Sequence, residues 1–356
     1  MTNKMKKELE LYIHIPFCVR KCAYCDFRSA PAGREVQAQY VDRLLEEIRE
    51  AAPLTEDYEV VSAFFGGGTP SILPEEEIRR VMDLLHRQFD WKADAEVTIE
   101  ANPGTVDGRK LDAYRSFGIN RISFGLQSAD NEELQKLGRI HTWEQFLESY
   151  ESARAAGFTN INVDLMSALP GQTRKSWKET LQKVLILNPE HISAYSLIIE
   201  EGTPFYEKYA DHPELLPPED EERQMYYDTK RILAEQGYER YEISNYARKG
   251  YACRHNLGYW SRDYKGFGLG ASSLLNSVRS TVQEDLTEYL RGNFAGSSEH
   301  LSKQDIREEY FFLGLRKMEG VDPAPYREHY EKLLEELQKQ QLLQEKNGRI
   351  CLTDYG

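Results

Sequence analysis

Short apolar runs alternate with amphipathic stretches over the first 200 residues of the chain. The runs predict six buried strands, while the stretches between them repeat apolar residues at helical spacing, as at Val36, Tyr40, Leu44 and Ile48. Strands that alternate with helices predict a parallel sheet with helical crossovers. We therefore expect an α/β fold, in which a partial barrel explains the series better than an open doubly wound sheet. The predicted strands cover residues 11–15, 60–65, 95–100, 121–124, 160–165 and 191–198.

The pattern changes after about residue 200. Two amphipathic helices and a hairpin, whose turn is predicted at Asn347-Gly348, suggest a small module of winged-helix shape at the carboxyl end. We expect three domains, over residues 1–200, 201–295 and 296–356. The segments predicted in the second and third are a helix to 236, a strand over 241–246, a glycine-rich stretch over 266–270, and helices over 303–318 and 325–341.

Composition excludes several classes of protein. The net charge of −14, from 45 basic and 59 acidic residues, argues against binding along a nucleic-acid backbone, which needs a surplus of Lys and Arg. No apolar run approaches the ~20 residues of a membrane span. The amino-terminal MTNKMKKELE lacks the apolar segment of a secretory signal. Five cysteines without an export signal then predict reduced thiols and a cytoplasmic location.

Cys18, Cys22 and Cys25 follow the first predicted strand in the spacing C-x3-C-x2-C. Three thiols on so short a loop indicate three ligands of one centre. A [4Fe–4S] cluster with one open iron suits three cysteines, and the open iron can bind a small molecule. Structural zinc needs a fourth ligand, for which His14 is the only nearby imidazole. The spacing alone leaves both readings open.

Further polar or glycine-rich positions fall at the carboxyl ends of the predicted strands, where βα barrels place their working residues. They are residues 66–70 (GGGTP), Glu100, Gln127 and Asp164. The glycines let the backbone approach a ligand closely, but taken alone they are better explained by a tight structural turn. Together with Arg139, the polar side chains offer carboxylates for ribose hydroxyls or an ammonium group, and a guanidinium for a carboxylate.

Several segments, taken in order, resemble radical S-adenosylmethionine (SAM) proteins: YIHIPFCVRKCAYCDF, FFGGGTP, IEANPG, GLQS and INVDLMSALPGQT. Within that superfamily the chain is similar to the oxygen-independent coproporphyrinogen III oxidase family, and specifically to its HemW branch of haem chaperones. The resemblance covers nearly the whole chain. It implies a partial (β/α)6 barrel, a [4Fe–4S] cluster on the three cysteines, and SAM chelating the open iron.

The resemblance also assigns contacts to SAM. It implies that Tyr12 and Tyr24 flank the cofactor, that Arg139 lies near the SAM carboxylate, and that Asp164 lies near its ribose. The whole set implied to bind SAM is Tyr12, Tyr24, Gly67, Gly68, Thr69, Glu100, Gln127, Arg139 and Asp164.

Two departures distinguish the chain from the oxidase. Phe27 stands where the oxidase has a further cysteine, and only 17 residues precede Cys18. Residues 255–260, HNLGYW, match the H-N-x-x-Y-W signature of the HemW branch, which implies that His255 binds haem. Imidazole is a common ligand of haem iron, and the neighbouring Tyr and Trp rings would pack on the porphyrin. Without the resemblance, His255 is equally a satisfied buried polar residue, and Cys253 is a second candidate ligand.

The expected function is therefore that of a haem chaperone that delivers haem to acceptor proteins such as respiratory enzymes, membrane-bound ones included. The resemblance makes a flavodoxin-like electron donor a further candidate partner. It leaves open whether SAM is cleaved, and the sequence leaves the oligomeric state open. The alternative is oxidative decarboxylation of coproporphyrinogen III by a radical SAM enzyme, against which Phe27 and the short leading segment count. A radical enzyme acting on another substrate is a third reading.

Overall fold

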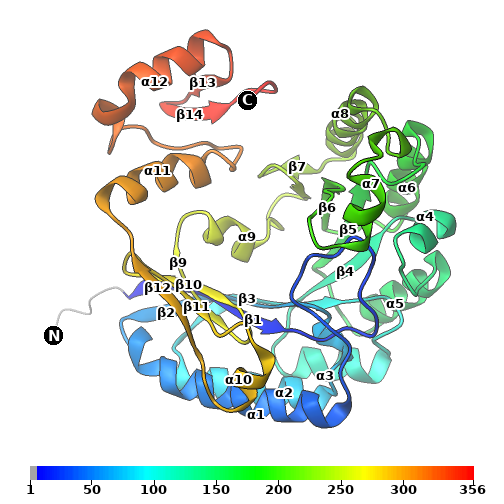
Figure 1. Cartoon of the computed structure of the whole chain (residues 1–356), viewed down its shortest axis with the longest axis vertical. Coiled ribbons are helices and arrows are strands. Elements are labelled where there is room, and N and C mark those ends of the chain that lie inside the picture. The colour runs from blue at the N-terminus through cyan, green and yellow to red at the C-terminus, as the bar shows by residue number, and fades with distance from the viewer. Residues whose placement is uncertain (1–5) are drawn as a thin grey trace.

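A computed structural model describes residues 6–356. The first five residues, part of the segment in which we expect no export signal, lie outside this range. A 12-stranded sheet dominates the fold, in the order β12-β11-β10-β9-β1-β2-β3-β4-β5-β6-β8-β7 (Figure 1). Its central strands are β1 (Lys7–Ile15), β2 (Tyr58–Gly67), β3 (Trp91–Ala101), β4 (Arg121–Gln127), β5 (Ile161–Ser167) and β6 (His191–Ser196).

These six strands lie side by side in chain order and pair in parallel. They coincide with the six predicted segments. Most are longer than predicted, although β5 begins one residue later and β6 ends two residues earlier. The predicted α/β fold and parallel series are thus confirmed. Parallel strands in chain order bring their carboxyl ends to one edge, so the loops that follow them gather there.

Helices cover the outer face of the curved sheet (Figure 1). Each turns one apolar face inward, as α2 does with Ile78, Val81 and Leu85, which are all buried. The core lies between this helical layer and the apolar residues of the strands, such as Leu11 and Ile13 of β1. The helices of the series are α1 (Arg34–Ala51), α2 (Glu75–Gln88), α3 (Gly108–Ser116), α4 (Asn131–Lys136), α5 (Trp143–Ala155) and α6 (Arg174–Ile186).

The sheet continues beyond the predicted series on both sides. β9 (Asp263–Phe267) pairs in parallel with β1, and antiparallel strands extend the sheet from it. The prediction of one strand over 241–246 is wrong, because Glu242 accepts hydrogen bonds from Ser244 N and Asn245 Nδ2 and turns the chain there. The additional strands are β7 (Glu239–Arg240), β8 (Asn245–Ala247), β10 (Ser272–Leu275), β11 (Val278–Val282) and β12 (Ala295–His300).

The carboxyl-terminal segment consists of two helices and a hairpin with an apolar cluster of its own, formed by Phe311, Val321, Leu334, Leu343 and Ile350. It is tied to the rest of the chain by a hydrogen bond from Met318 N to Tyr241 O (3.0 Å). The division into three domains stays a prediction. The remaining elements are α7 (Pro204–Tyr209), α8 (Glu219–Glu235), α9 (Arg254–Tyr259), α10 (Leu286–Leu290), α11 (Lys303–Gly314), α12 (Arg327–Lys339), β13 (Leu343–Lys346) and β14 (Arg349–Leu352).

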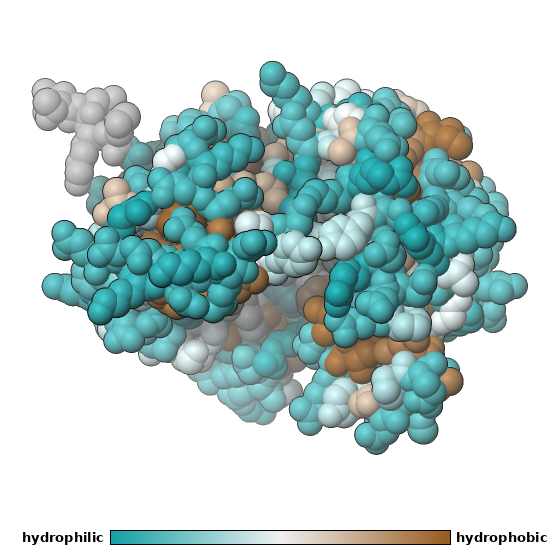
Figure 2. Space-filling model, turned by 90° about the horizontal axis from the view of Figure 1, so that it is seen from above, coloured by the Kyte–Doolittle hydropathy of each residue, from teal (hydrophilic) through white to brown (hydrophobic). Residues whose placement is uncertain are grey.

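The surface seen in Figure 2 is mostly hydrophilic, and its apolar side chains form separate patches rather than a continuous band. Across residues 6–356, none of the helices combines the length and the apolar character that crossing a bilayer requires.

Candidate functional site

The cysteine loop is held at both ends by the backbone. Phe17 and Ala30 form a parallel bridge, with hydrogen bonds from Cys18 N to Ala30 O (3.2 Å) and from Ala30 N to Pro16 O (3.0 Å). All three loop cysteines are free thiols and line one cavity of about 330 Å³, which we call the cysteine cavity. Burial raises the pKa of Cys18 and of Cys25. Ligation would therefore have to displace their protons.

Nearly all residues expected to bind SAM lie in this same cavity. Most of them come from the ends of consecutive strands or from the loops nearby, which is the arrangement that the parallel series predicts. The lining includes Cys18, Cys22, Cys25, Tyr24, Gly67, Gly68, Thr69, Glu100, Gln127, Arg139 and Asp164.

The glycine turn after β2 packs tightly against the cysteine loop. Gly67 has a φ of +110°, and a Cβ there would lie 2.6 Å from the His14 ring. At Gly68 a Cβ would overlap the Phe17 carbonyl oxygen. The N–H groups of Gly68 and Thr69 donate to the carbonyls of Ile15 (2.8 Å) and Phe17 (2.7 Å). The turn therefore fixes the cysteine loop, whatever else it binds.

Gln127 and Arg139 point into the cavity from β4 and from the loop after α4. Gln127 has a positive φ of 73°, next to a register shift between β4 and β5, and accepts a hydrogen bond from Tyr195 OH (3.0 Å). Arg139 Nη1 lies 3.6 Å from Cys22 Sγ, and its Nε is buried without a hydrogen-bond partner among the described residues. Strained backbone and an unpaired buried donor are both features that functional sites retain.

Two acidic residues, Glu100 and Asp164, line the cysteine cavity and influence each other electrostatically. Burial and the neighbouring Asp164 raise the pKa of Glu100 to about 8, and burial raises the pKa of Asp164. Asp164 accepts hydrogen bonds from Asn162 Nδ2 (2.7 Å) and Ser123 Oγ (3.2 Å). It lies in the middle of β5 and not at the strand end, where the sequence had placed it. A bound cation would relieve the repulsion between the two groups.

His14 does not belong to this group of residues. Its Nδ1 lies 3.0 Å from Tyr12 OH and its Nε2 lies 3.2 Å from Arg28 O, so both ring nitrogens are engaged. It lines a different cavity, and burial lowers its pKa. His14 is therefore not placed to be the fourth ligand that a structural zinc site on these cysteines would require.

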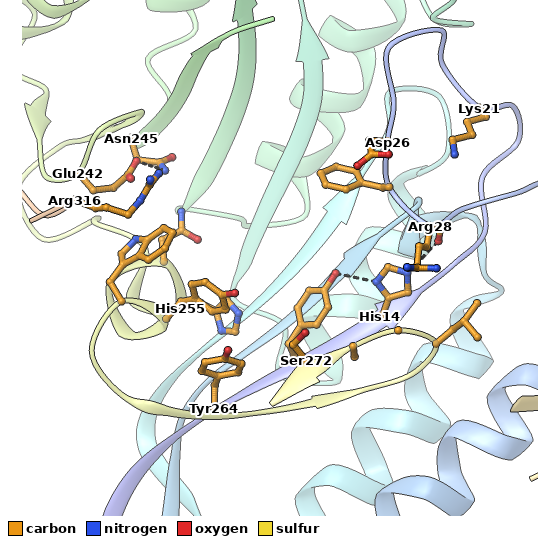
Figure 3. A pocket seen from close by; sticks show the side chains of 18 residues that line it. His14, Lys21, Asp26, Arg28, Glu242, Asn245, His255, Tyr264, Ser272 and Arg316 are labelled. Atoms are coloured by element: carbon orange, nitrogen blue, oxygen red, sulfur yellow. Dashed lines mark hydrogen bonds between the residues drawn. The ribbon is translucent and has the colours of Figure 1, made fainter. Parts of the chain in front are cut away.

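A second cavity, of about 850 Å³, adjoins the first and contains the other two predicted residues, Tyr12 and His255. We call it the aromatic cavity, because rings from β1, α9 and β9 line it (Figure 3). Figure 3 shows Arg316, Glu242 and Asn245 on one side of these rings and Lys21, Asp26 and Arg28 on the other. The aromatic lining is Tyr12, His14, Phe27, His255, Tyr259, Trp260 and Tyr264. Cavities of roughly 300–1,000 Å³ hold cofactor-sized ligands.

His255 stands in the first turn of α9 with only 7% of its surface exposed. Its ring stacks on Phe64 (centroids 5.0 Å apart), and its Nδ1 lies 3.1 Å from Ser62 Oγ and 3.3 Å from Glu10 Oε2. Burial and the charge of Arg121 lower the pKa of His255 to about 3, so the imidazole is neutral. With a proton on Nδ1, the Nε2 lone pair is available to a metal.

Cys253, the other candidate haem ligand, is fully buried and lines neither cavity. Its Sγ lies 3.4 Å from Glu96 Oε1, and burial raises its pKa. The structure therefore favours His255 over Cys253 as the residue that can meet a ligand.

Comparison with known proteins gives concordant results. The Radical SAM superfamily model matches residues 12–184, and the HemN C-terminal domain model matches residues 301–356. A Bacillus subtilis (strain 168) protein named heme chaperone HemW is 35% identical over 360 residues, covering 97% of this chain and 95% of that protein. An Escherichia coli (strain K12) protein of the same name is 37% identical over 320 residues, covering 88% and 84%.

The chain belongs to the HemW family of radical SAM proteins. The solved structure of coproporphyrinogen III oxidase (HemN) from Escherichia coli has a TM-score of 0.84 to this chain at 27% identity, covering 100% of this chain and 88% of that one. The radical SAM fold and the kinship with the oxidase family, both predicted from the motifs, are confirmed.

Membership of the superfamily implies a [4Fe–4S] cluster and SAM. The residues of the cysteine cavity fit both groups. Three free thiols could serve as the ligands of a cluster with one open iron, and the unpaired Nε of Arg139 would suit a carboxylate. Glu100 and Asp164 would offer acceptors for an ammonium group and ribose hydroxyls.

Sequence reasoning missed several residues of both cavities. Asn102, Arg121 and Tyr195 line the cysteine cavity, and Tyr264 and Arg316 line the aromatic one. Asn102 follows β3 in an Asn-Pro-Gly turn, a signal that could have marked it. Arg316 lies far along the chain, after α11, and had no local signal. Glu10 and Ser62 line neither cavity but lie close to His255, and they were also missed. Glu10 precedes the predicted strand over 11–15, and Ser62 looks like an ordinary position inside a strand.

Proposed function

We propose that this protein is a haem chaperone, which binds haem in the aromatic cavity with the Nε2 atom of His255 on the iron. The observation that carries the proposal is the neutral imidazole of His255 at the wall of an 850 Å³ cavity lined by aromatic rings. Such a wall suits a flat apolar macrocycle, and imidazole is an ordinary axial ligand. Relatives over nearly the whole chain bear the name heme chaperone.

In this proposal Cys18, Cys22 and Cys25 hold a [4Fe–4S] cluster and the cysteine cavity holds SAM. The cluster would supply an open iron to which the amino and carboxylate groups of SAM bind. Arg139 would orient the carboxylate and Asp164 the ribose, as charged hydrogen-bonding partners. Tyr24 lines the same cavity, while Tyr12 stands at the aromatic cavity, with its ring 3.1 Å from the position of a Cβ on Gly66.

The recipients we propose are haem-requiring proteins such as respiratory enzymes, and the place of action is the cytoplasm. A flavodoxin-like donor would supply electrons if the cluster is reduced in function. Phe27 supports a link between the two sites, since it lines both cavities and is 68% exposed.

Haem titration followed by absorbance tests the ligand assignment. The unaltered protein is expected to bind one haem, and His255→Ala is expected to bind it at least 10-fold more weakly, because the axial bond is lost. Cys253→Ala is the matched control and should leave the titration unchanged. Equal titration curves for the unaltered protein and His255→Ala would remove the assignment.

The second candidate is the oxidase activity, which the likeness to the solved oxidase favours. Anaerobic incubation of the reconstituted protein with coproporphyrinogen III, SAM and a reductant distinguishes the two. A chaperone gives no protoporphyrinogen IX, whereas steady formation of that product would overturn the chaperone proposal.

A further inference from the structure

Glu10 is a buried carboxyl group in β1 with no exposed surface, and burial raises its pKa to about 8 although Arg262 lies beside it. Its Oε1 accepts a hydrogen bond from Arg262 Nη1 (3.0 Å). Its Oε2 has no hydrogen-bond partner among the described residues and lies 3.3 Å from His255 Nδ1. A buried oxygen without a partner is costly, and such an atom in a native fold needs a reason.

The packing around Glu10 is built to keep the carboxylate beneath α9. Gly258, in the same helix as His255, faces it, and a Cβ at that position would overlap Glu10 Oε1. Glu10 is also the register partner of Ser62 on β2, whose Oγ lies 3.1 Å from His255 Nδ1. Glu10 Oε2 and Ser62 Oγ, from adjacent strands, therefore both lie close to His255 Nδ1. Only a glycine at position 258 leaves space for the Glu10 side chain.

From this geometry we infer that Glu10 is a positioning residue for His255, which fixes the ring with Nδ1 protonated and Nε2 free for haem iron. Histidines that ligate metals commonly direct their other ring N–H to a carboxylate, which fixes the tautomer and raises the basicity of the ligand. Ligation of ferric iron makes the Nδ1–H group more acidic, so its interaction with the unpaired oxygen of Glu10 strengthens when iron is bound. Glu10 should therefore favour ferric over ferrous haem.

This inference rests on the proposed haem-binding role of His255. The test measures the affinities for ferric and ferrous haem, and the midpoint potential of the bound haem, in Glu10→Gln. Glutamine carries no charge and has one acceptor oxygen where glutamate has two, so it cannot accept hydrogen bonds from both Arg262 and His255. We expect ferric affinity to fall about 10-fold to 100-fold, ferrous affinity to fall less, and the potential to rise.

The matched control is Glu133→Gln. Glu133 is also buried, but it accepts hydrogen bonds from Ser128 Oγ (2.6 Å) and Gln172 Nε2 (2.9 Å) and lines neither cavity. The control should change neither the potential nor the ratio of ferric to ferrous affinity. If Glu10→Gln changes neither the ratio of ferric to ferrous affinity nor the midpoint potential, while haem binding still depends on His255, the inferred role of Glu10 is wrong and the proposed function stands. Haem binding that does not depend on His255 overturns the proposed function as well.

A measurement on the unaltered protein keeps the test decisive if Glu10→Gln does not fold. In the low-spin ferric complex, the Nδ1–H proton of the axial histidine should be visible by NMR and should exchange slowly with solvent. Slow exchange follows from its place between two buried oxygen atoms. Exchange too fast to observe would overturn the inference.

Discussion

The cysteine cavity and the aromatic cavity share Lys21, Phe27, Asn245 and Asn256 on their common wall, yet their linings differ in kind. The cysteine cavity is lined by thiols, carboxylates, a guanidinium and glycine backbone from consecutive strand ends. The aromatic cavity is lined by rings from β1, the cysteine loop, α9 and β9, together with Arg316 from the segment after α11. The first suits a small, charged, highly polar ligand, and the second a large flat one.

The comparison shows two ways to build a site. A parallel barrel edge gathers polar residues without any special packing, because successive strands end there. The aromatic cavity forms only because β9 pairs with β1, from which it is distant in sequence. It also requires the carboxyl-terminal segment to pack against Tyr241. If the two sites are separate, a change in one should leave the binding of the other site's ligand unaffected.

The largest effect is expected from replacing all three loop cysteines by serine. Reconstituted iron content and visible absorbance should fall to background, because hydroxyl groups replace the thiolate ligands of the cluster. Ferric haem affinity should stay within about twofold, less than 0.5 kcal/mol. Cys351→Ser, in the distant β14, is the control and should retain full iron content. A triple variant that keeps its iron would disprove the ligand assignment.

Gly258→Ala should act on the aromatic cavity alone. Its Cβ would overlap Glu10 Oε1, and overpacking of this kind costs about 1–3 kcal/mol of unfolding free energy. Urea denaturation at fixed pH measures the change. The control is Gly108→Ala, where a Cβ meets nothing within 4 Å, so its stability should be unchanged or slightly raised. Equal stabilities for the two variants would show that the absence of a side chain at Gly258 is not required to accommodate Glu10.

Asp164→Asn should weaken SAM binding to the cluster-loaded protein by about 10-fold, as expected when a charged hydrogen bond is lost. Calorimetric titration with SAM measures the affinity, and haem affinity should not change. Asp112→Asn, an exposed position on α3, is the control. A tenfold loss of haem affinity instead would show that Asp164 serves the other cavity.

The last expected effect is a pH dependence of stability from Glu100. Its pKa is about 8 in the folded chain against an ordinary 4.5, so the folded state holds a proton that the unfolded state releases between these values. Stability should therefore fall as pH rises from 4.5 to 8, by at most about 1.4 kcal/mol per pH unit for this group. Glu100→Gln should reduce this slope in denaturation curves taken across the range, and Glu10, whose pKa is also about 8, should account for the slope that remains. An unreduced slope in the variant would assign it to other groups.

Sequence reasoning reached the cysteine cavity more fully than the aromatic one. The three cysteines, the glycine turn, Glu100 and Gln127 all follow or end apolar runs that could be recognised as strands. Asp164 was placed at the end of β5, although it lies inside that strand, since apolar periodicity locates strand ends only roughly. Arg316 and Tyr264 had no such signal, because their place depends on which distant strand pairs with β1.

The sequence by itself determined the α/β class, the order of the six parallel strands and the residues gathered at their carboxyl ends. Hydrophobic periodicity and local motifs are properties of short segments, and they survive without knowledge of the packing. Only the tertiary structure decided that β9 extends the sheet, that His14 faces away from the cysteines, and that Glu10 lies beneath His255. These are contacts between segments distant in the chain, and their free energy depends on burial and exact distance, which no local pattern encodes.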